Sequence, residues 1–347
     1  MNTSPIADHP EDPGRCPVCE APAGGLIEEV HGFDLVECSG CGLQYTANAR
    51  SQIERYAMSY EGKPGILDDA RPYASPATRL ALEAAALWRP PPYLTVAERW
   101  VMDRIRGSLP GGCLVLDIGC GTGRFLDALR RRGFRAAGIE PVEGMAAALR
   151  ARGYDVRMQQ LPRLSWDEPP PSAVTLFEVL EHLPEPMPAL EELRRQFPCA
   201  PIGASVPSPT RVGLERGERG GSDHPPNHFL RWNPEALEQA FTRAGYRRVL
   251  VHAPSPAPNE LAPGIGVIVP PQVFRRLQGC AAAPPARSLP AGGSHSPTTL
   301  GWRLSATALL LGHRVLRLAG GVAAAPRSLQ ARRRGRSSAS LAIWAEP

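Results

Sequence analysis

The sequence predicts an α/β protein whose main domain is a doubly wound parallel sheet. Three observations lead to this fold class. An apolar strand ending at Ile118 runs into a glycine-rich turn and then into a helix-spaced segment at 124–130. Further short apolar strands alternate with amphipathic helices as far as residue 251. Alternation of this kind makes neighbouring strands parallel and covers both faces of the sheet with helices.

The expected elements follow a regular order. Two helices, 78–88 and 95–109, precede the first strand at 115–118, and the prolines at 90–92 separate them. Five strands are then expected at 136–140, 154–158, 173–177, 201–206 and 246–251, with helices between them at 144–152, 189–195 and 234–244. Asn233 is the expected N-cap of the last of these helices. A final strand is expected at 340–345.

Composition bounds the classes of function. A chain of 347 residues with 43% hydrophobic residues suits a globular protein of one or two domains. No apolar segment follows Met1, so no secretory signal is expected and the cytoplasm is the expected location. The net charge of +5 is unevenly distributed, because residues 261–345 contain eleven arginines and no acid. This segment predicts either a surface partner, such as anionic lipid, or an arginine-biased insertion without one; nucleic acid is the less favoured partner.

The segment Asp117-Ile118-Gly119-Cys120-Gly121-Thr122-Gly123 is the most specific motif in the chain. Its glycines lack a Cβ, so a ligand can lie directly against the backbone. The next strand ends in Glu140, where a carboxylate can accept hydrogen bonds from a pair of ribose hydroxyls. Arg124 stands where the dinucleotide fingerprint has its last glycine. The acid that precedes the loop favours a ligand with a cationic amino-acid end over a pyrophosphate.

This motif resembles motif I of the class I S-adenosylmethionine-dependent methyltransferases. The resemblance covers about residues 95–252 and the final strand. It implies a seven-stranded Rossmann-like methyltransferase sheet with an antiparallel last strand, and S-adenosyl-L-methionine as cofactor. The implied cofactor contacts are Asp117 and Gly119 with the methionine amino group, Gly121 and Gly123 with the body of the cofactor, Glu140 with the ribose, and Pro141, Gln160, Leu161 and Phe177 around the adenine and the methyl group.

The segment 177–184, after the fourth strand, carries the candidate catalytic residues. A sulfonium already makes its methyl group electrophilic, so the protein mainly has to align a nucleophile and remove its proton. His182 is the base candidate because the ordinary pKa of histidine lies near working pH. Glu181 and His228 complete the candidate set, and the segment around His228 closes over the acceptor in the family. An alternative is that Glu181 and His182 only brace the loop through hydrogen bonds.

Four cysteines form two Cys-x-x-Cys pairs, Cys16 with Cys19 and Cys38 with Cys41, and eighteen residues separate the pairs. In a cytoplasmic protein this spacing favours metal binding over disulfides. Two such turns can bring four thiolates to one tetrahedral ion, which predicts a zinc ribbon. Four thiolates leave no open coordination position, so the Zn²⁺ is expected to be structural. A redox dithiol is the competing interpretation.

The predicted organisation places a disordered segment at 1–12, the zinc ribbon at 13–47 and a helical linker or lid at 48–94. The methyltransferase domain is expected at 95–253 and its final strand at 338–347. Between them, a Pro/Arg-rich insertion at 254–337 carries an apolar helix at about 300–322. That helix either packs on its own domain or lies at a membrane surface.

The expected function is methyl transfer from S-adenosylmethionine to a hydroxyl or carbon of a small-molecule, sugar or lipid-linked acceptor. Two alternatives stay open. Glu178, Glu181, His182 and His228 resemble the metal ligands of the small-RNA 3′-terminal 2′-O-methyltransferases, which would imply a metal-dependent RNA ribose 2′-O-methyltransferase. A non-catalytic adaptor that retains the fold is the other alternative.

Overall fold

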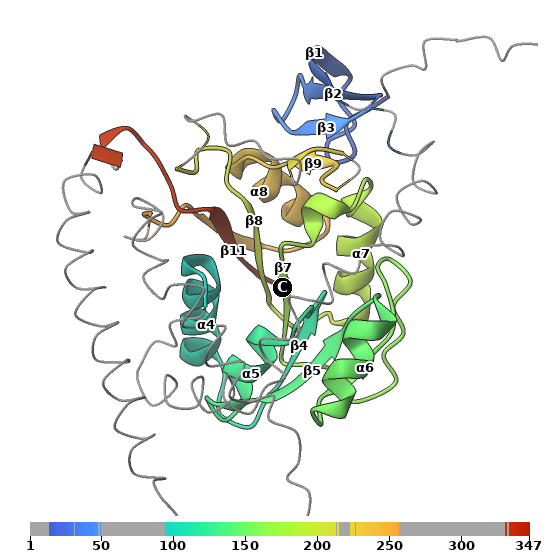
Figure 1. The fold of residues 1–347 in the computed structure, drawn as a ribbon, viewed down its shortest axis with the longest axis vertical. Coiled ribbons are helices and arrows are strands. Elements are labelled where there is room, and N and C mark those ends of the chain that lie inside the picture. The colour runs from blue at the N-terminus through green and yellow to red at the C-terminus, as the bar shows by residue number, and fades with distance from the viewer. Residues whose placement is uncertain are drawn as a thin grey trace, which may run out of the picture.

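The computed structural model describes residues 14–47 except 31, residue 49, residues 94–256 except 213, 215–222 and 226, and residues 330–347 except 332. These residues form a seven-stranded sheet flanked by helices and a smaller four-stranded sheet (Figure 1). The expected disordered segment at 1–12 and the helices at 78–88 and 300–322 lie outside the described residues.

The large sheet has the predicted doubly wound topology. Its strands are β4 (Leu114–Ile118), β5 (Arg135–Ile139), β6 (Asp155–Arg157), β7 (Ala173–Phe177), β8 (Ile202–Pro207), β10 (Arg248–His252) and β11 (Ser340–Glu346). They lie in the order β10-β11-β8-β7-β4-β5-β6. The strands from β8 to β6 are parallel, whereas β11 pairs antiparallel with both β8 and β10. The Rossmann-like class and the antiparallel final strand are therefore confirmed.

Helices cover both faces of this sheet. They are α4 (Val96–Ser108), α5 (Arg124–Arg130), α6 (Glu143–Ala151), α7 (Pro186–Gln196) and α8 (Pro234–Arg243). Successive side chains of a strand point to opposite faces. Val115 accordingly packs in one core cluster with α4 and α5, and Leu116 in another with α7 and α8. Strand β4, which leads into α5, is thus packed between two hydrophobic core clusters, one on each face of the sheet.

The helix ends follow from local sequence. Thr95 and Glu98 form a capping box at α4, and the Asn233 side chain accepts a 2.7 Å hydrogen bond from the backbone N–H of Ala236 at α8. Caps of this kind stabilise a helix by about 1 kcal/mol each. Helix α7 begins at Pro186, three residues before the expected start, because proline is tolerated in a first turn whose N–H groups have no intrahelical partner.

The N-terminal ribbon consists of β1 (Ala23–Val30), β2 (Phe33–Cys38) and β3 (Gln44–Thr46), all antiparallel. A fourth strand, β9 (Leu230–Arg231), comes from the segment between β8 and α8 and pairs with β3 (Figure 1). Neither β3 nor β9 is expected from the sequence, because strands of three and two residues carry no usable periodicity. The ribbon and the large sheet also share one hydrophobic core cluster. The two sheets are therefore packed together.

Among the described helices, none has the length and apolarity needed to cross a membrane.

Candidate functional site

The glycine-rich loop between β4 and α5 adopts a left-handed backbone at Gly119, Gly121 and Gly123, with φ of 68°, 53° and 78°. A Cβ at Gly119 would lie 2.6 Å from the side chain of Val179, and a Cβ at Gly123 would lie 2.4 Å from that of Leu149. At Gly121 the nearest side-chain atom would be 3.7 Å away, an ordinary contact. Packing within the protein therefore requires glycine at positions 119 and 123. This requirement is separate from the access for a ligand that the sequence predicts.

Asp117 lies near the end of β4, where its carboxylate is buried and accepts a 2.6 Å hydrogen bond from Thr175 Oγ1. Burial raises the pKa of Asp117 to about 7, against the opposing effect of the Thr175 hydrogen bond. The negative charge of Glu98 raises this pKa further. A buried carboxylate of this kind is stabilised by a nearby cation. The ammonium group of an amino-acid ligand has the required charge.

Glu140 follows β5 and connects the end of that strand to the glycine loop. Its Oε2 accepts a 2.8 Å hydrogen bond from the backbone N–H of Gly121, and its Oε1 a 3.0 Å hydrogen bond from that of Val142. Burial raises the pKa of Glu140, while these two donors act to lower it. Because each carboxylate oxygen can accept two hydrogen bonds, both retain capacity for a ligand hydroxyl. The arrangement fits the predicted ribose contact.

Glu98 is a residue of this region that the sequence reasoning missed. It lies buried on α4 and forms an ion pair with Arg124, the first residue of α5. Its other oxygen accepts a hydrogen bond from the backbone N–H of Thr95. The capping-box spacing of Thr95 and Glu98 could have identified the helix start but not the ion pair. Through this pair, α4 is fixed to the loop that follows Asp117.

The residues predicted to line the adenine and methyl end lie along the carboxyl edge of the parallel strands. Pro141 and Gln160 are exposed, and Leu161 is half-buried. Phe177, the last residue of β7, is half-buried with its ring centroid 4.5 Å from that of Phe125. In an open parallel sheet, ligands bind beyond this edge. Their assignment as cofactor contacts stays a prediction.

The segment after β7 is not an α-helix. Glu178 has a left-handed backbone with φ of 55°, and only Leu180–His182 form a short 3₁₀ turn, η1. An α-helix would place Glu178, Glu181 and His182 on one face, and this arrangement is therefore absent. Glu178 instead accepts a 2.8 Å hydrogen bond from Ser205 Oγ.

The turn nevertheless brings the three predicted catalytic residues together. Candidate ligand atoms of Glu181, His182 and His228 all lie within 4.8 Å of one another. The imidazole rings of His182 and His228 meet edge to face, with centroids 4.7 Å apart. The Glu181 carboxyl is fully buried, and no donor in the described part of the chain reaches either of its oxygens. Burial, followed by the charge of Glu178, raises the pKa of Glu181 well above its usual range.

His182 is a weaker base than its ordinary pKa suggests. Its Nδ1 lies 2.6 Å from the backbone oxygen of Asn227, which assigns the proton to Nδ1 and leaves Nε2 as an acceptor. Burial, together with the neighbouring His228, lowers the pKa of His182 to about 4. His182 is therefore neutral at working pH. The sequence could not reveal this because the burial arises from the loop that returns at 227–229.

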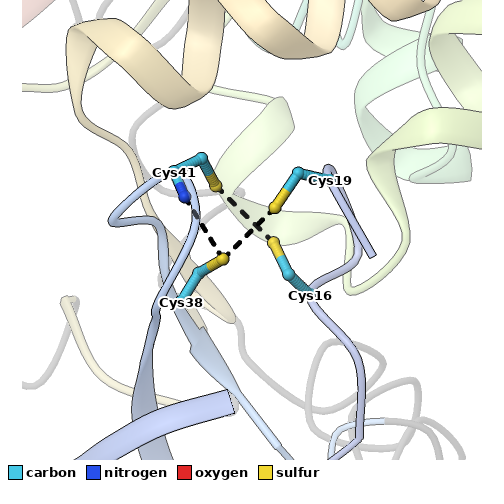
Figure 2. Close-up of side chains that lie close together, drawn as sticks. All are labelled: Cys16, Cys19, Cys38 and Cys41. Carbon is cyan, nitrogen blue, oxygen red and sulfur yellow. Dashed lines mark hydrogen bonds between the residues drawn. The ribbon is translucent and has the colours of Figure 1, made fainter. Parts of the chain in front are cut away.

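The four cysteines of the ribbon converge as predicted (Figure 2). The Sγ atoms of Cys16 and Cys41 are 3.7 Å apart, and those of Cys19 and Cys38 are 3.3 Å apart. A tetrahedral zinc with Zn–S bonds of about 2.3 Å places its sulfurs about 3.8 Å apart. Burial acts to raise the pKa of Cys38, but the N–H of Cys41, the thiol of Cys19 and the N–H of Gly40 together lower it to about 7. The geometry fits a zinc ribbon.

A polar pocket lies where the ribbon meets the residues that follow β8 and those around β9. Its volume is about 660 Å³, a value that includes its open mouth. From the ribbon it is lined by Gly42 and Gln44, and from the other side chiefly by residues around His228. Its complete lining is Gly42, Gln44, Pro207, Pro209, Arg211, Leu214, Asp223, His228, Leu230, Arg231, Trp232 and Asn233.

The sequence profile of a methyltransferase domain family matches residues 96–251, which contain the loop, Glu140 and η1. The chain contains a methyltransferase domain. Curated relatives of this methyltransferase-domain protein include the ubiquinone biosynthesis O-methyltransferase of Xylella fastidiosa, 35% identical over 82 residues, or 22% of this chain and 33% of that protein. The enzyme of the same name from Pseudomonas entomophila is 35% identical over 94 residues, or 25% of this chain and 39% of that protein.

The chain thus spans about a third of the length of these curated relatives. Similar solved structures include an S-adenosylmethionine-dependent methyltransferase from Archaeoglobus fulgidus, with 18% identity, a TM-score of 0.42, and coverage of 72% of this chain and 94% of that one. Another is phosphoethanolamine N-methyltransferase 2 from Haemonchus contortus, with 13% identity, a TM-score of 0.40, and coverage of 72% of this chain and 51% of that one.

Proposed function

We propose that the protein transfers the methyl group of S-adenosylmethionine to a hydroxyl or carbon of a small-molecule, sugar or lipid-linked acceptor. The observation that carries this proposal is the pair of buried carboxylates, Asp117 and Glu140, on either side of the glycine loop. Asp117 would bind the cofactor ammonium and Glu140 the ribose hydroxyls. The cofactor supplies an electrophilic methyl group, so the protein has to orient the acceptor and accept its proton.

We propose that the imidazoles of His182 and His228 receive that proton. Val179, which precedes η1, packs against Gly119, so this turn borders the glycine loop proposed to hold the cofactor. The Nδ1 of His228 lies 3.7 Å from Asp223 Oδ1, a contact that would fix the orientation of the ring. His228 is therefore the base that we favour, and neutral His182 would orient it. A positioned base of this kind typically contributes about 10²–10⁴-fold to the rate.

We also propose that the cysteine cluster holds one structural Zn²⁺. The convergence of Cys16, Cys19, Cys38 and Cys41 to tetrahedral spacing supports this, and four thiolates leave no position for a reacting water. The zinc would then stabilise the ribbon and take no part in methyl transfer.

The test is transfer of labelled methyl from S-adenosylmethionine into a fractionated host extract. Label in small-molecule, glycan or lipid fractions is expected, and it would identify the acceptor class. No label in any fraction, with purified protein that binds the cofactor, would contradict methyl transfer and favour the adaptor.

A second candidate function is favoured by the Glu181 carboxylate. This buried group without a donor, close to two imidazoles, has the composition of a two-histidine, one-carboxylate site for a divalent cation. With Nδ1 of His182 at Asn227 O and Nδ1 of His228 near Asp223, Nε2 is the ring nitrogen that each histidine would present to a cation. A bound cation would lower the pKa of an acceptor hydroxyl.

Chelation alone cannot test this candidate, because a chelator also removes zinc from the ribbon. The better comparison is Glu181→Gln, which keeps the ribbon cysteines. If the reaction needs the cation, the wild-type rate depends on added Mg²⁺ or Mn²⁺ and the variant loses that dependence. A wild-type rate that is unchanged by these ions at full zinc occupancy would exclude the second candidate. Cation-dependent label in RNA would identify an RNA ribose as the acceptor.

A further inference from the structure

The ribbon and the segment that follows His228 share one four-stranded sheet, β1-β2-β3-β9. Gln44 and Tyr45 of β3 pair with Arg231 and Leu230 of β9, directly after His228. The Asn233 side chain also donates a 3.0 Å hydrogen bond to Cys41 O, which belongs to the second cysteine turn. The position of the ribbon relative to His228 is thus fixed by backbone pairing.

Ion pairs reinforce the same seam. Arg231 Nη1 lies 2.6 Å from Glu28 Oε1 on β1 of the ribbon, and His224 Nε2 lies 3.7 Å from the same oxygen. On the opposite side, Arg211 forms an ion pair with Asp223. The side chains of both arginines and of Asp223 are largely buried. Partly buried pairs of this kind are less screened by salt than surface pairs.

The polar pocket described above opens between these pairs and reaches the cofactor loop through a chain of contacts. His228 lines the pocket and packs edge to face on His182. His182 follows Val179 in the same turn, and Val179 packs against Gly119. His228 therefore lies between the pocket and the turn that borders the cofactor loop.

We infer that the pocket between ribbon and methyltransferase domain is the acceptor site, and that the acceptor presents a hydroxyl on an uncharged ring. This inference rests on the proposed function. The ribbon would then supply one wall of the site, with Gln44 as a residue that determines acceptor specificity.

The chemistry of the lining supports an uncharged, hydroxylated ligand. Arg211 pairs with Asp223, and Arg231 pairs with Glu28 behind the lining, so each arginine of the lining already has an acidic partner. The same pairs present both donors and acceptors of hydrogen bonds, as a hydroxyl requires, because it donates one bond and accepts others. Pro207 and Pro209 add apolar surface on which a ring can lie. A phenol and a sugar ring share this chemistry.

The test compares two tryptophan substitutions on the ribbon with full-length, zinc-loaded protein. Gln44→Trp fills the ribbon wall of the pocket, whereas Glu29→Trp adds the same side chain at an exposed position of β1. Tryptophan suits both strand positions. We expect Gln44→Trp to lower methyl transfer by about tenfold or more with unchanged affinity for S-adenosylmethionine, and Glu29→Trp to behave as wild type.

Wild-type transfer rates in Gln44→Trp would overturn the inferred site while leaving the proposed function intact. If Gln44→Trp fails to fold, Gln44→Ala replaces it, and a rise in the acceptor KM larger than the fall in kcat is expected. Ion exchange of the labelled product tests the ligand class: label in the neutral fraction supports the inference, and label confined to charged compounds overturns it. Organic extraction then separates phenols from sugars. Absence of transfer by wild type would instead overturn the proposed function.

Discussion

Thr46 donates two hydrogen bonds to the carbonyl oxygen of Phe229, one from its backbone N–H at 2.9 Å and one from Oγ1 at 3.1 Å. Thr46 ends β3 of the ribbon, and Phe229 follows the candidate base His228. The N–H of Phe229 in turn donates to the backbone oxygen of Glu181 at 2.8 Å. The backbone of one residue, Phe229, thus joins the ribbon to the turn that carries Glu181 and His182.

Thr46→Val should lower turnover by severalfold, because it removes the Oγ1 bond that helps to hold Phe229 and so His228. The loss of one hydrogen bond should reduce stability by about 1 kcal/mol. Steady-state kinetics and calorimetric cofactor binding separate the two roles. We expect kcat to fall with an unchanged dissociation constant for S-adenosylmethionine, and Thr46→Ser to restore kcat. A fall in cofactor affinity of the same size would contradict this positioning role.

Asp117→Asn should abolish tight binding of S-adenosylmethionine while preserving the fold, since an asparagine oxygen can still accept from Thr175. The pKa of about 7 for Asp117 lies above its unfolded value of 3.8. The folded wild type therefore holds a proton that the unfolded chain has lost, and its stability falls as pH rises between these values. Denaturant unfolding across this window should show a smaller fall for the variant. An identical pH slope in both proteins would contradict the raised pKa.

The same titration predicts how cofactor affinity depends on pH. A cationic ammonium binds the ionised form of Asp117, so affinity should rise as pH increases from about 6 to 7.5. Titration calorimetry at several pH values measures this directly. An affinity that falls over this range would exclude Asp117 as the ammonium partner.

Glu140→Ala should weaken cofactor binding severely, because it removes the ribose acceptor and also the partner of the Gly121 N–H. Glu140→Gln is the matched variant, since its amide oxygen can retain one backbone hydrogen bond. We expect intermediate affinity for the glutamine variant and a normal melting temperature. Equal binding of S-adenosylmethionine by wild type and Glu140→Ala would remove the ribose assignment.

Cys38→Ser should abolish zinc binding and weaken the seam between ribbon and domain, because Cys38 ends β2 beside β3. Elemental analysis should find about one zinc per chain in wild type and much less in the variant. Cys199→Ser, at an exposed cysteine outside the cluster, is the control. Zinc at wild-type stoichiometry in Cys38→Ser would contradict the four-cysteine site.

Much of the fold can be predicted because its elements carry strong local signals. The run from Val115 to Ile118 followed by spaced glycines indicates a strand and a turn, and Asn233 before Pro234 indicates a helix start. The two cysteine pairs likewise predict their own convergence. These features depend on residues close together in the sequence.

The remaining features depend on contacts between distant segments. The pairing of β3 with β9 joins residues 44–45 to 230–231, and no local periodicity in the sequence predicts it. The lowered pKa of His182 follows from burial by a loop about 45 residues later. From the sequence, Glu98 is predicted only to cap a helix, and its ion pair with Arg124 is seen only in the structure. Local sequence cannot carry information about such tertiary neighbours.

The most direct test of the account is a calorimetric titration of purified, zinc-loaded protein with S-adenosylmethionine. If Asp117 and Glu140 hold the cofactor, S-adenosylmethionine binds saturably at one site per chain. Asp117→Asn abolishes this binding and Glu29→Trp leaves it unchanged. Folded wild-type protein that binds no S-adenosylmethionine, or that binds it equally well after Asp117→Asn, would contradict the cofactor site on which the proposed function depends.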